Sequence, residues 1–231
     1  RLAMPPVETS TYGRGADIPR LLPESGLHIL DEHFLRVRIA LMSLPGRTLS
    51  DIKLVRAHLV LLPQSARFLR THGIAGHAAA DSAGAAAELA RAKTPAEGVL
   101  ASELAASIYG LEVLAHNIED HGHNTTRFLV MGREPDARRR ADRMMTTFVF
   151  EVRNIPAALY KAMGGFATNG VNMTKLESYM LDGSFTATQF YADIEGHPED
   201  DNGRLAPDEL RYFTSYLHIL GTYPADPRRH E

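Results

Sequence analysis

The most constraining feature of this 231-residue chain is a regular alternation of short apolar stretches with helical patterns between residues 52 and 131. The stretches that we expect to be strands are 52–55, 77–80, 98–101, 111–114 and 128–131. The helical segments between them are 63–71, the alanine-rich run that Asp81 and Ser82 cap, and 103–109. Gly73 and Gly110 follow two of these helices as C-caps. The alternation predicts a mostly parallel sheet with helices on both faces.

The chain before this region gives two further expectations. A short helix is predicted over 18–22, before Pro23. The segment His33–Ser43 alternates apolar and polar side chains with a period of two, which is typical of a strand. We therefore expect one continuous strand there, ended by Pro45 and Gly46.

The pattern changes after residue 132. Five arginines interleave with acidic residues over 133–143, which indicates a solvated linker or short helix and gives no basis for nucleic-acid binding. Beyond it we expect strand 146–152, a helix from Pro156 to near Gly170, strands 171–179 and 185–194 joined by an Asp182-Gly183 turn, helix 207–217 and strand 219–223. That order is the ferredoxin-like split β-α-β arrangement.

Composition excludes several classes of protein. The net charge of −3 gives no electrostatic reason to expect a nucleic acid or an anionic membrane as partner. The longest apolar runs fall short of the roughly 20 residues that span a bilayer. The chain has no cysteine, so it forms no disulfide and has no thiolate metal ligand or cysteine nucleophile. Without a basic-then-apolar leader in view, we expect a cytoplasmic protein.

The motif with most chemical content is Asn124-Thr125-Thr126-Arg127-Phe128, which joins a polar cluster to an apolar run. This signature resembles the Asn-x-Thr-Arg-Phe motif of prephenate dehydratases, which convert prephenate to phenylpyruvate. Pro6-Val7-Glu8-Thr9-Ser10 is similar to the family's Pro-Ile-Glu-Asn-Ser loop, with Thr9 in place of Asn. His58 and Gln64 match a Ser-His-Pro-Gln…Gln-Cys stretch.

Two later segments resemble the ACT regulatory domain that follows the catalytic domain in this family. Asn172-Met173-Thr174-Lys175-Leu176-Glu177-Ser178 stands where ACT domains have Asn-Leu-Thr-Lys-Ile-Glu-Ser. Ala157-Ala158-Leu159 stands where they have Gly-Ala-Leu. The resemblance covers nearly the whole chain.

The resemblance implies an α/β fold with a two-lobed, periplasmic-binding-protein-like dehydratase domain over 1–132, a linker over 133–143 and a ferredoxin-like ACT domain over 144–231. Family members have a substantial segment before the Pro-x-Glu-Asn-Ser loop, whereas this chain starts almost at the loop. We therefore expect the first lobe to lack its opening strand and glycine-bearing loop.

The implied reaction removes CO2 and a ring hydroxyl from prephenate. Because aromatisation drives the step, we expect neither a cofactor nor a metal. Thr126 would donate a hydrogen bond to the departing oxygen, beside Arg127 and Phe128. The implied substrate contacts are Glu8, Thr9, Ser10, His58, Gln64 and Ser82. In the ACT-like region the implied phenylalanine contacts are Ala157, Ala158, Leu159, Asn172, Glu177 and Ser178. A homodimer or homotetramer is expected.

Several assignments have a simpler structural alternative. Arg127 either binds a substrate carboxylate or, as we favour, pairs with Glu119 or Asp120. Ser82 belongs either to an anion site or to an ordinary N-cap. The threonines at 125 and 126 would otherwise only satisfy backbone groups at a strand end, and the ACT-like contacts would only build a sheet and a dimer interface.

Two further alternatives concern a metal and the function of the whole chain. We interpret His116, Asp120, His121 and His123 as part of a solvated loop rather than a metal site, because they show no helical i, i+4 pair. The competing function is a catalytically inactive relative that senses an aromatic amino acid.

Overall fold

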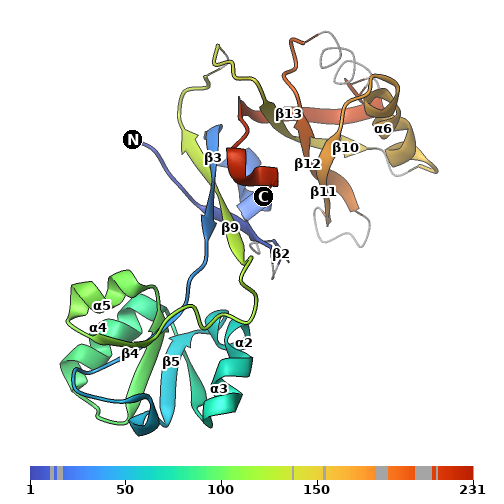
Figure 1. The fold of residues 1–231 in the computed structure, drawn as a ribbon. Helices are drawn as coiled ribbons and strands as arrows, with labels where there is room; N and C mark the ends of the chain where they lie inside the picture. The colour runs from blue at the N-terminus through green and yellow to red at the C-terminus, as the bar shows by residue number, and fades with distance from the viewer. Residues whose placement is uncertain are drawn as a thin grey trace. The chain divides into compact units, whose positions relative to one another are not determined.

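The chain forms two compact units joined by two crossings of the backbone. The computed structural model describes residues 1–10, 13–14, 18–136, 138–152, 155–180, 187–200, 210–211 and 213–230. Unit 1 comprises Arg1–Leu35 and Thr126–Glu231, and unit 2 comprises Arg36–Thr125 (Figure 1). Unit 2 is therefore a single excursion of the chain out of unit 1. No helix within the described ranges is both long and apolar enough to cross a membrane.

Unit 2 is built on a five-stranded sheet with the order β6-β5-β7-β4-β8. The strands are β4 Ala40–Ser43, β5 Leu54–His58, β6 Ala75–Ala79, β7 Glu97–Ala101 and β8 Glu112–Ala115. β5 pairs in parallel with β6 and β7, but β4 runs antiparallel to β7 and to β8. The expected alternation is present, yet the sheet is mixed rather than mostly parallel because β4 enters it in the opposite direction.

Helices cover both faces of this sheet, as expected (Figure 1). They are α2 Leu61–Gln64, α3 Ala66–His72, α4 Ser82–Ala92 and α5 Glu103–Tyr109, and a 3-10 turn, η2, spans Leu49–Asp51. Leu89 of α4 packs with Val99 on one face, and Leu69 of α3 packs with Val55 on the other. The predicted caps are confirmed, since Asp81 accepts a hydrogen bond from the Gly84 backbone and both C-cap glycines have positive φ.

Unit 1 contains two sheets, the first of which has the order β2-β1-β9-β3. Its strands are β1 Pro6–Thr9, β2 Gly13–Arg14, β3 His28–Arg36 and β9 Thr125–Gly132. The short helix α1 Ile18–Leu21 is present where expected and continues into the 3-10 turn η1 Leu22–Glu24. The stretch 128–131 belongs to this sheet rather than to the alternating set, because β9 pairs with β1 and β3.

The prediction of one strand over His33–Ser43 is wrong. β3 ends at Arg36 and β4 begins at Ala40, and the two strands belong to different sheets. Between them, the Val37 N–H donates to the Asn124 carbonyl and the Ile39 N–H donates to the Glu119 carboxylate. The alternation of side chains continues through this crossing, so the pattern alone carries no sign of the change of sheet.

The second sheet of unit 1 has the order β11-β12-β10-β13, and all its pairs are antiparallel. The strands are β10 Met144–Val152, β11 Met173–Met180, β12 Ala187–Glu195 and β13 Thr214–Pro224. Helix α6 Ala158–Thr168 lies between β10 and β11 in sequence, and a 3-10 turn, η3 Pro227–His230, follows β13. This is the strand order expected of a split β-α-β arrangement.

Two predictions for this sheet need comment. The Asp182-Gly183 turn lies outside the described residues. The helix predicted over 207–217 is wrong at its end, because Thr214–Leu217 belongs to β13. There Tyr216 and Leu217 pair with Glu151 and Phe150 of β10, so cross-strand pairing extends the strand into the predicted helix.

The second sheet is buried on both faces. Phe148, Phe150 and Phe190 pack against Phe166 of α6 on one face. On the other face Val149, Tyr191 and Tyr223 share a core with first-sheet residues, which include Val7, Ile29 and Leu129. Gly221 is needed at this junction, because a Cβ there would overlap the carbonyl oxygen of Ile29. The two sheets of unit 1 are therefore packed backbone to backbone at β3 and β13.

We expect Ala157→Gly to stabilise the chain by about 0.5–1 kcal/mol. Ala157 precedes α6 with φ of 60° and ψ of 19°, a left-handed conformation that costs an L-residue with a Cβ about 1–2 kcal/mol. Part of that gain is offset because glycine loses more backbone freedom on folding. Denaturant unfolding measures the change. The control is Ala158→Gly inside α6, which should destabilise; a loss of stability in both variants would contradict this account of Ala157.

Candidate functional site

Strands β1 and β9 bring two of the sequence motifs together in unit 1. Thr9 is the register partner of Thr126, and Glu8 is the partner of Arg127. The Thr9 and Thr126 hydroxyl oxygens lie 3.1 Å apart, within hydrogen-bonding distance. Phe128 pairs with Pro6, and Ser10 follows β1 as an exposed residue. The Pro-x-Glu loop and the Thr-Arg-Phe motif are therefore neighbours, as a shared site requires.

Arg127 is a deeply buried cation of this region, with a side chain only 1% exposed. Its guanidinium nitrogens donate to Glu32 at 2.9 Å and to Glu8 at 2.8 Å. They also donate to Asp193 of β12 at 2.5 Å and to the Tyr223 hydroxyl of β13 at 2.9 Å. Residues from both sheets of unit 1 thus converge on one cation.

Each of these partners is held in turn by another group. Glu32 also pairs with Arg229 of η3 and accepts the Asp226 backbone N–H. Asp193 accepts the Thr147 hydroxyl at 2.6 Å. Glu8 accepts from Lys175 of β11 at 2.5 Å. Because every buried charge has an opposite charge or a hydrogen-bond donor beside it, the cluster avoids the cost of an unpaired buried ion.

The ion pairs shift the titration of this cluster. Burial alone would raise the pKa of Glu8, but the positive charges of Arg127 and Lys175 outweigh it and lower that pKa below its ordinary value of 4.5. Burial would lower the pKa of Arg127, yet Tyr223, Asp193, Tyr191 and Glu32 raise that pKa. Burial raises the pKa of Tyr223. Glu8 and Arg127 are therefore both charged at neutral pH, and Tyr223 is a neutral hydrogen-bonding group.

The favoured pairing of Arg127 with Glu119 or Asp120 is wrong. Glu119 lies 3.7 Å from Arg36, and Asp120 accepts from the backbone of Arg67. Arg127 instead takes its carboxylate partners from β1, β3 and β12. The network occupies the guanidinium, so within the described residues Arg127 anchors the strand that carries Thr126.

Three other predicted contacts lie in unit 2, near the carboxyl end of β5. The His58 backbone N–H donates to the Ser82 hydroxyl at 3.0 Å. Gln64 ends α2 and is 7% exposed, and its carbonyl oxygen accepts the Asp120 N–H. Its side-chain oxygen and the Ser65 hydroxyl are buried without a hydrogen-bond partner among the described residues. The N-cap of α4 is Asp81, and Ser82 follows it as the first helical residue.

The predicted phenylalanine contacts divide between two faces of β11. Ser178 pairs with Phe190, so it lies on the α6 face with Leu159. Glu177 pairs with Tyr191 on the opposite face, where it contacts Lys175 at 3.0 Å. Asn172 precedes β11 and donates to Glu195. Within one copy of the chain, Glu177 and Ser178 therefore do not point into the same space.

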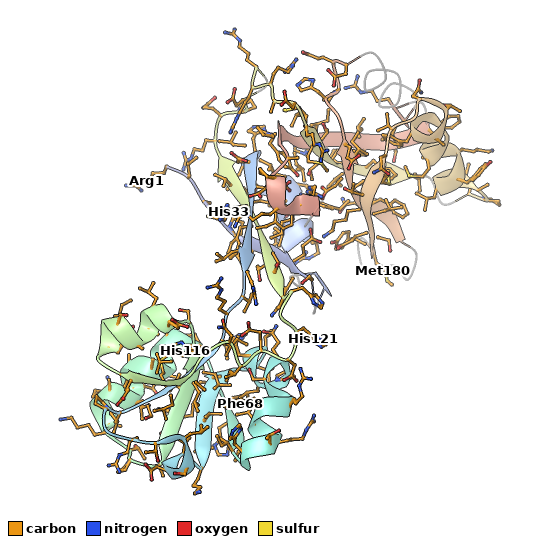
Figure 2. The ribbon with its side chains drawn as sticks, in the orientation of Figure 1. Arg1, His33, Phe68, His116, His121 and Met180 are labelled. Atoms are coloured by element: carbon orange, nitrogen blue, oxygen red, sulfur yellow. The ribbon has the colours of Figure 1, made fainter. Side chains whose placement is uncertain are left out.

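The histidines do not gather around a point. His116 contacts Glu103 at 2.7 Å, whereas His121 and His123 pack ring against ring. Figure 2 shows His116 and His121 at separate places along the segment after β8. Among the described residues no group of three or more His, Asp or Glu side chains is arranged to hold a metal.

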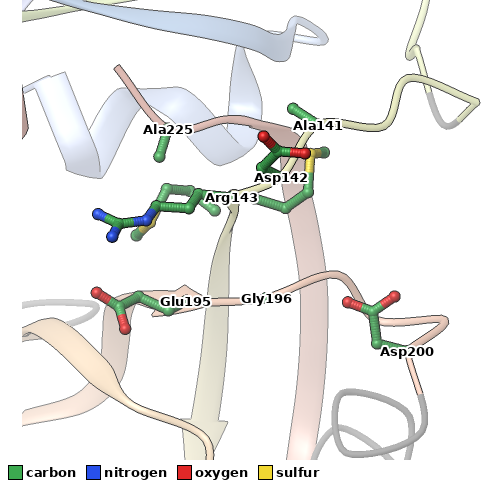
Figure 3. A pocket seen from close by; sticks show the side chains of 9 residues that line it. Ala141, Asp142, Arg143, Glu195, Gly196, Asp200 and Ala225 are labelled. Atoms are coloured by element: carbon green, nitrogen blue, oxygen red, sulfur yellow. The ribbon is translucent and has the colours of Figure 1, made fainter. Parts of the chain in front are cut away.

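A cavity of about 620 Å³ lies at the other end of β10 from α6. It is lined by Ala141, Asp142, Arg143, Met144, Met145, Glu195, Gly196, Asp200 and Ala225 (Figure 3). Arg143 and Asp142 are exposed there. None of these residues belongs to the motifs of the predicted site.

Sequence reasoning missed Glu32, Asp193, Tyr223 and, as a partner of Glu8, Lys175. Asp193, Tyr223 and Lys175 are polar or charged residues inside predicted strands, whereas Glu32 precedes the strand predicted from His33. Such residues in a buried strand need a partner. The pattern gives no indication which partner, since Asp193 and Arg127 are 66 residues apart in sequence.

We expect Arg127→Met to destabilise unit 1 by about 3–5 kcal/mol, because Asp193 would remain buried without its cation and Glu32 would keep only Arg229. The matched control is Arg67→Met, which removes an exposed pair with Asp120 and should cost about 1 kcal/mol or less. Urea unfolding of both variants measures the difference. Equal losses would show that the Arg127 cluster contributes no more than a surface pair.

Stability should also fall with acid through Glu8. Because its pKa is lower in the folded state than the ordinary 4.5, its contribution is complete above pH 4.5 and is lost as pH falls through the folded-state pKa. Unfolding free energies between pH 7 and pH 3 should therefore decline less steeply for Glu8→Gln than for the parent chain. Parallel declines would exclude Glu8 as a source of the acid sensitivity.

Comparison with known proteins identifies the family. A family model described as prephenate dehydratase matches residues 1–136. A bifunctional N-acyl-homoserine lactone acylase/prephenate dehydratase of Komagataeibacter europaeus is 49% identical over 230 residues, which cover 99% of this chain and 82% of that protein. A chloroplastic arogenate dehydratase/prephenate dehydratase 1 of Arabidopsis thaliana is 36% identical, with 97% of this chain and 61% of that protein covered. The chain thus spans about three-fifths of the length of this plant relative.

Solved structures agree with this assignment. GqqA, described as a novel type of quorum quenching acylase, has a TM-score of 0.90 and 47% identity, covering 99% of this chain and 83% of that one. The prephenate dehydratase of Arthrobacter aurescens in complex with L-Phe has a TM-score of 0.87 and 28% identity, covering 97% of this chain and 75% of that one. By the family model and these relatives, the chain belongs to the prephenate dehydratase family.

Proposed function

We propose that this chain carries the dehydratase activity of its family, the decarboxylating dehydration of prephenate to phenylpyruvate. The observation that carries the proposal is the pairing of Thr9 with Thr126 beside the buried Arg127. A half-buried hydroxyl on a rigidly anchored strand is suited to donate a hydrogen bond to a leaving oxygen. Family membership supports the substrate class.

In this proposal Thr126 donates to the departing ring hydroxyl as negative charge develops on it. The hydroxyl of Thr9, 3.1 Å away, holds the Thr126 side chain in place. Glu8, Ser10 and Phe128 are the other substrate contacts proposed in unit 1. Departure of CO2 provides the electrons that aromatise the ring, so no redox cofactor is needed.

Thr126→Ala should lower kcat for phenylpyruvate formation by about 10²–10³-fold, the usual loss when one oxyanion donor is removed. Thr126→Ser keeps the hydroxyl and should retain most of the activity. The control is Thr125→Ala, which should keep most of the kcat. The Thr125 hydroxyl donates to the His123 carbonyl rather than to Thr9. Unchanged turnover in Thr126→Ala would sink the assignment of this residue.

We further propose that residues 144–231 form an ACT domain that binds L-phenylalanine as an effector. The antiparallel order β11-β12-β10-β13 supports this, as does the relative whose structure is described as a complex with L-Phe. Ala157, Ala158, Leu159 and Ser178 would contact the ligand on the α6 face, and Asn172 would lie at its edge. Glu177 lies on the opposite face and contacts Lys175 there, which argues against a contact with this ligand in one copy of the chain. A homodimer or homotetramer is part of the same proposal.

A second candidate activity is hydrolysis of N-acyl-homoserine lactones. It is favoured by the 49% identical relative whose description combines an acylase with a prephenate dehydratase. Incubation with an N-acyl-homoserine lactone and detection of the freed amine tests it. Running Thr126→Ala in the same assay shows whether both activities use one site.

A further inference from the structure

Lys175 of β11 joins the C-terminal sheet to strand β1 through an ion pair with Glu8. Its ammonium nitrogen lies 2.5 Å from one Glu8 carboxylate oxygen and 3.0 Å from Glu177. The Lys175 side chain is only 12% exposed, and its ammonium lies 5.8 Å from the centre of the Tyr191 ring. A lysine this buried is held by its partners rather than by water.

The other Glu8 oxygen accepts from Arg127 at 2.8 Å. The carboxylate therefore bridges two cations, one from β9 and one from β11, and each cation fixes one oxygen. The next register pair along β1 and β9 is Thr9 with Thr126. Glu8 and Thr9 are consecutive residues of β1 and face opposite sides of its sheet, so Lys175, which comes from the other sheet, can act on the proposed catalytic hydroxyl only through the β1 backbone.

We propose that Lys175 is a positioning residue: it orients Glu8 and thereby holds Thr9 against Thr126, so that residues 144–231 complete the dehydratase site. The proposal rests on the dehydratase function proposed above. With Lys175 absent, the Glu8 carboxylate keeps one cation and can rotate about its last bond. The β1 end, whose only described strand neighbours are β2 and β9, then loses its tie to β11. A displacement of about 1 Å at a reacting group is enough to cost about 10²-fold in rate.

The first test compares Lys175→Met, Lys175→Arg and the control Lys161→Met in phenylpyruvate formation. Lys161 lies exposed on α6 in the same part of the chain, so its variant carries the same substitution without the Glu8 contact. We expect kcat of Lys175→Met to fall about 10–100-fold with little change in KM, and Lys175→Arg to recover most of it. Wild-type kcat in Lys175→Met would overturn the proposal.

A double-mutant cycle shows whether Lys175 acts through Glu8. In a Glu8→Gln background, Lys175→Met should change kcat less than twofold, since the carboxylate it orients is gone. Equal fold-changes in both backgrounds would mean that Lys175 acts by another route and would overturn the proposal.

A measurement that does not depend on turnover separates the positioning role of Lys175 from the proposed dehydratase function. In NMR spectra of chains with labelled threonine methyl groups, the Thr126 and Thr9 resonances of Lys175→Met should differ from those of the parent chain. The resonances of Lys175→Arg and of Lys161→Met should match those of the parent chain. An inactive wild-type chain with these shifts would refute the function and support the positioning role. Unmoved resonances in folded Lys175→Met would overturn the positioning role whatever the activity.

Discussion

The buried guanidinium of Arg127 is the interaction on which unit 1 depends. A charge that is 1% exposed is tolerated only where opposite charges and hydrogen bonds replace the water it has lost. Here those groups come from β1, β3, β12 and β13, which are distant in sequence. The requirement to neutralise one side chain therefore fixes how two sheets face each other.

The same requirement gives the C-terminal sheet a role in the chemistry proposed for the N-terminal motifs. Asp193 and Tyr223 hold Arg127 from one side, and Glu8 and Glu32 hold it from the other. Lys175 adds a second tie through Glu8. The sequence pattern changes near residue 143. The hydrophobic core of unit 1 nevertheless contains residues from both sides of this position. The placement of the domain boundaries over 1–132 and 144–231 remains a prediction.

Local features of the sequence predicted the local structure well. Asp81, Gly73 and Gly110 act as caps because their preference depends only on neighbouring backbone. The order of the C-terminal strands was also recoverable, although only the second half of β13 was predicted as a strand. A shared site for Glu8 and Thr126 was implied only by the family resemblance, and the pairing of β1 with β9 was not predicted.

The failures have a common cause in long-range packing. The break within His33–Ser43 and the change from helix to strand at Thr214–Leu217 are set by partners elsewhere in the chain. The partners of Arg127 were misassigned because Glu119 and Asp120 are near in sequence, whereas Asp193 is near only after folding. Glycine at 221 gave no signal in the pattern, since only the approach of Ile29 explains it.

The topology of unit 2 has a consequence for how this chain tolerates rearrangement. Residues 36–125 leave unit 1 and return to it at two adjacent points, since the Val37 N–H and the Asn124 carbonyl are joined by a 2.8 Å hydrogen bond. A segment whose ends meet can be exchanged, lengthened or closed with a short turn without reordering the strands outside it. Unit 2 is thus an inserted module, and a change of its length leaves the order of the strands around Arg127 as it is.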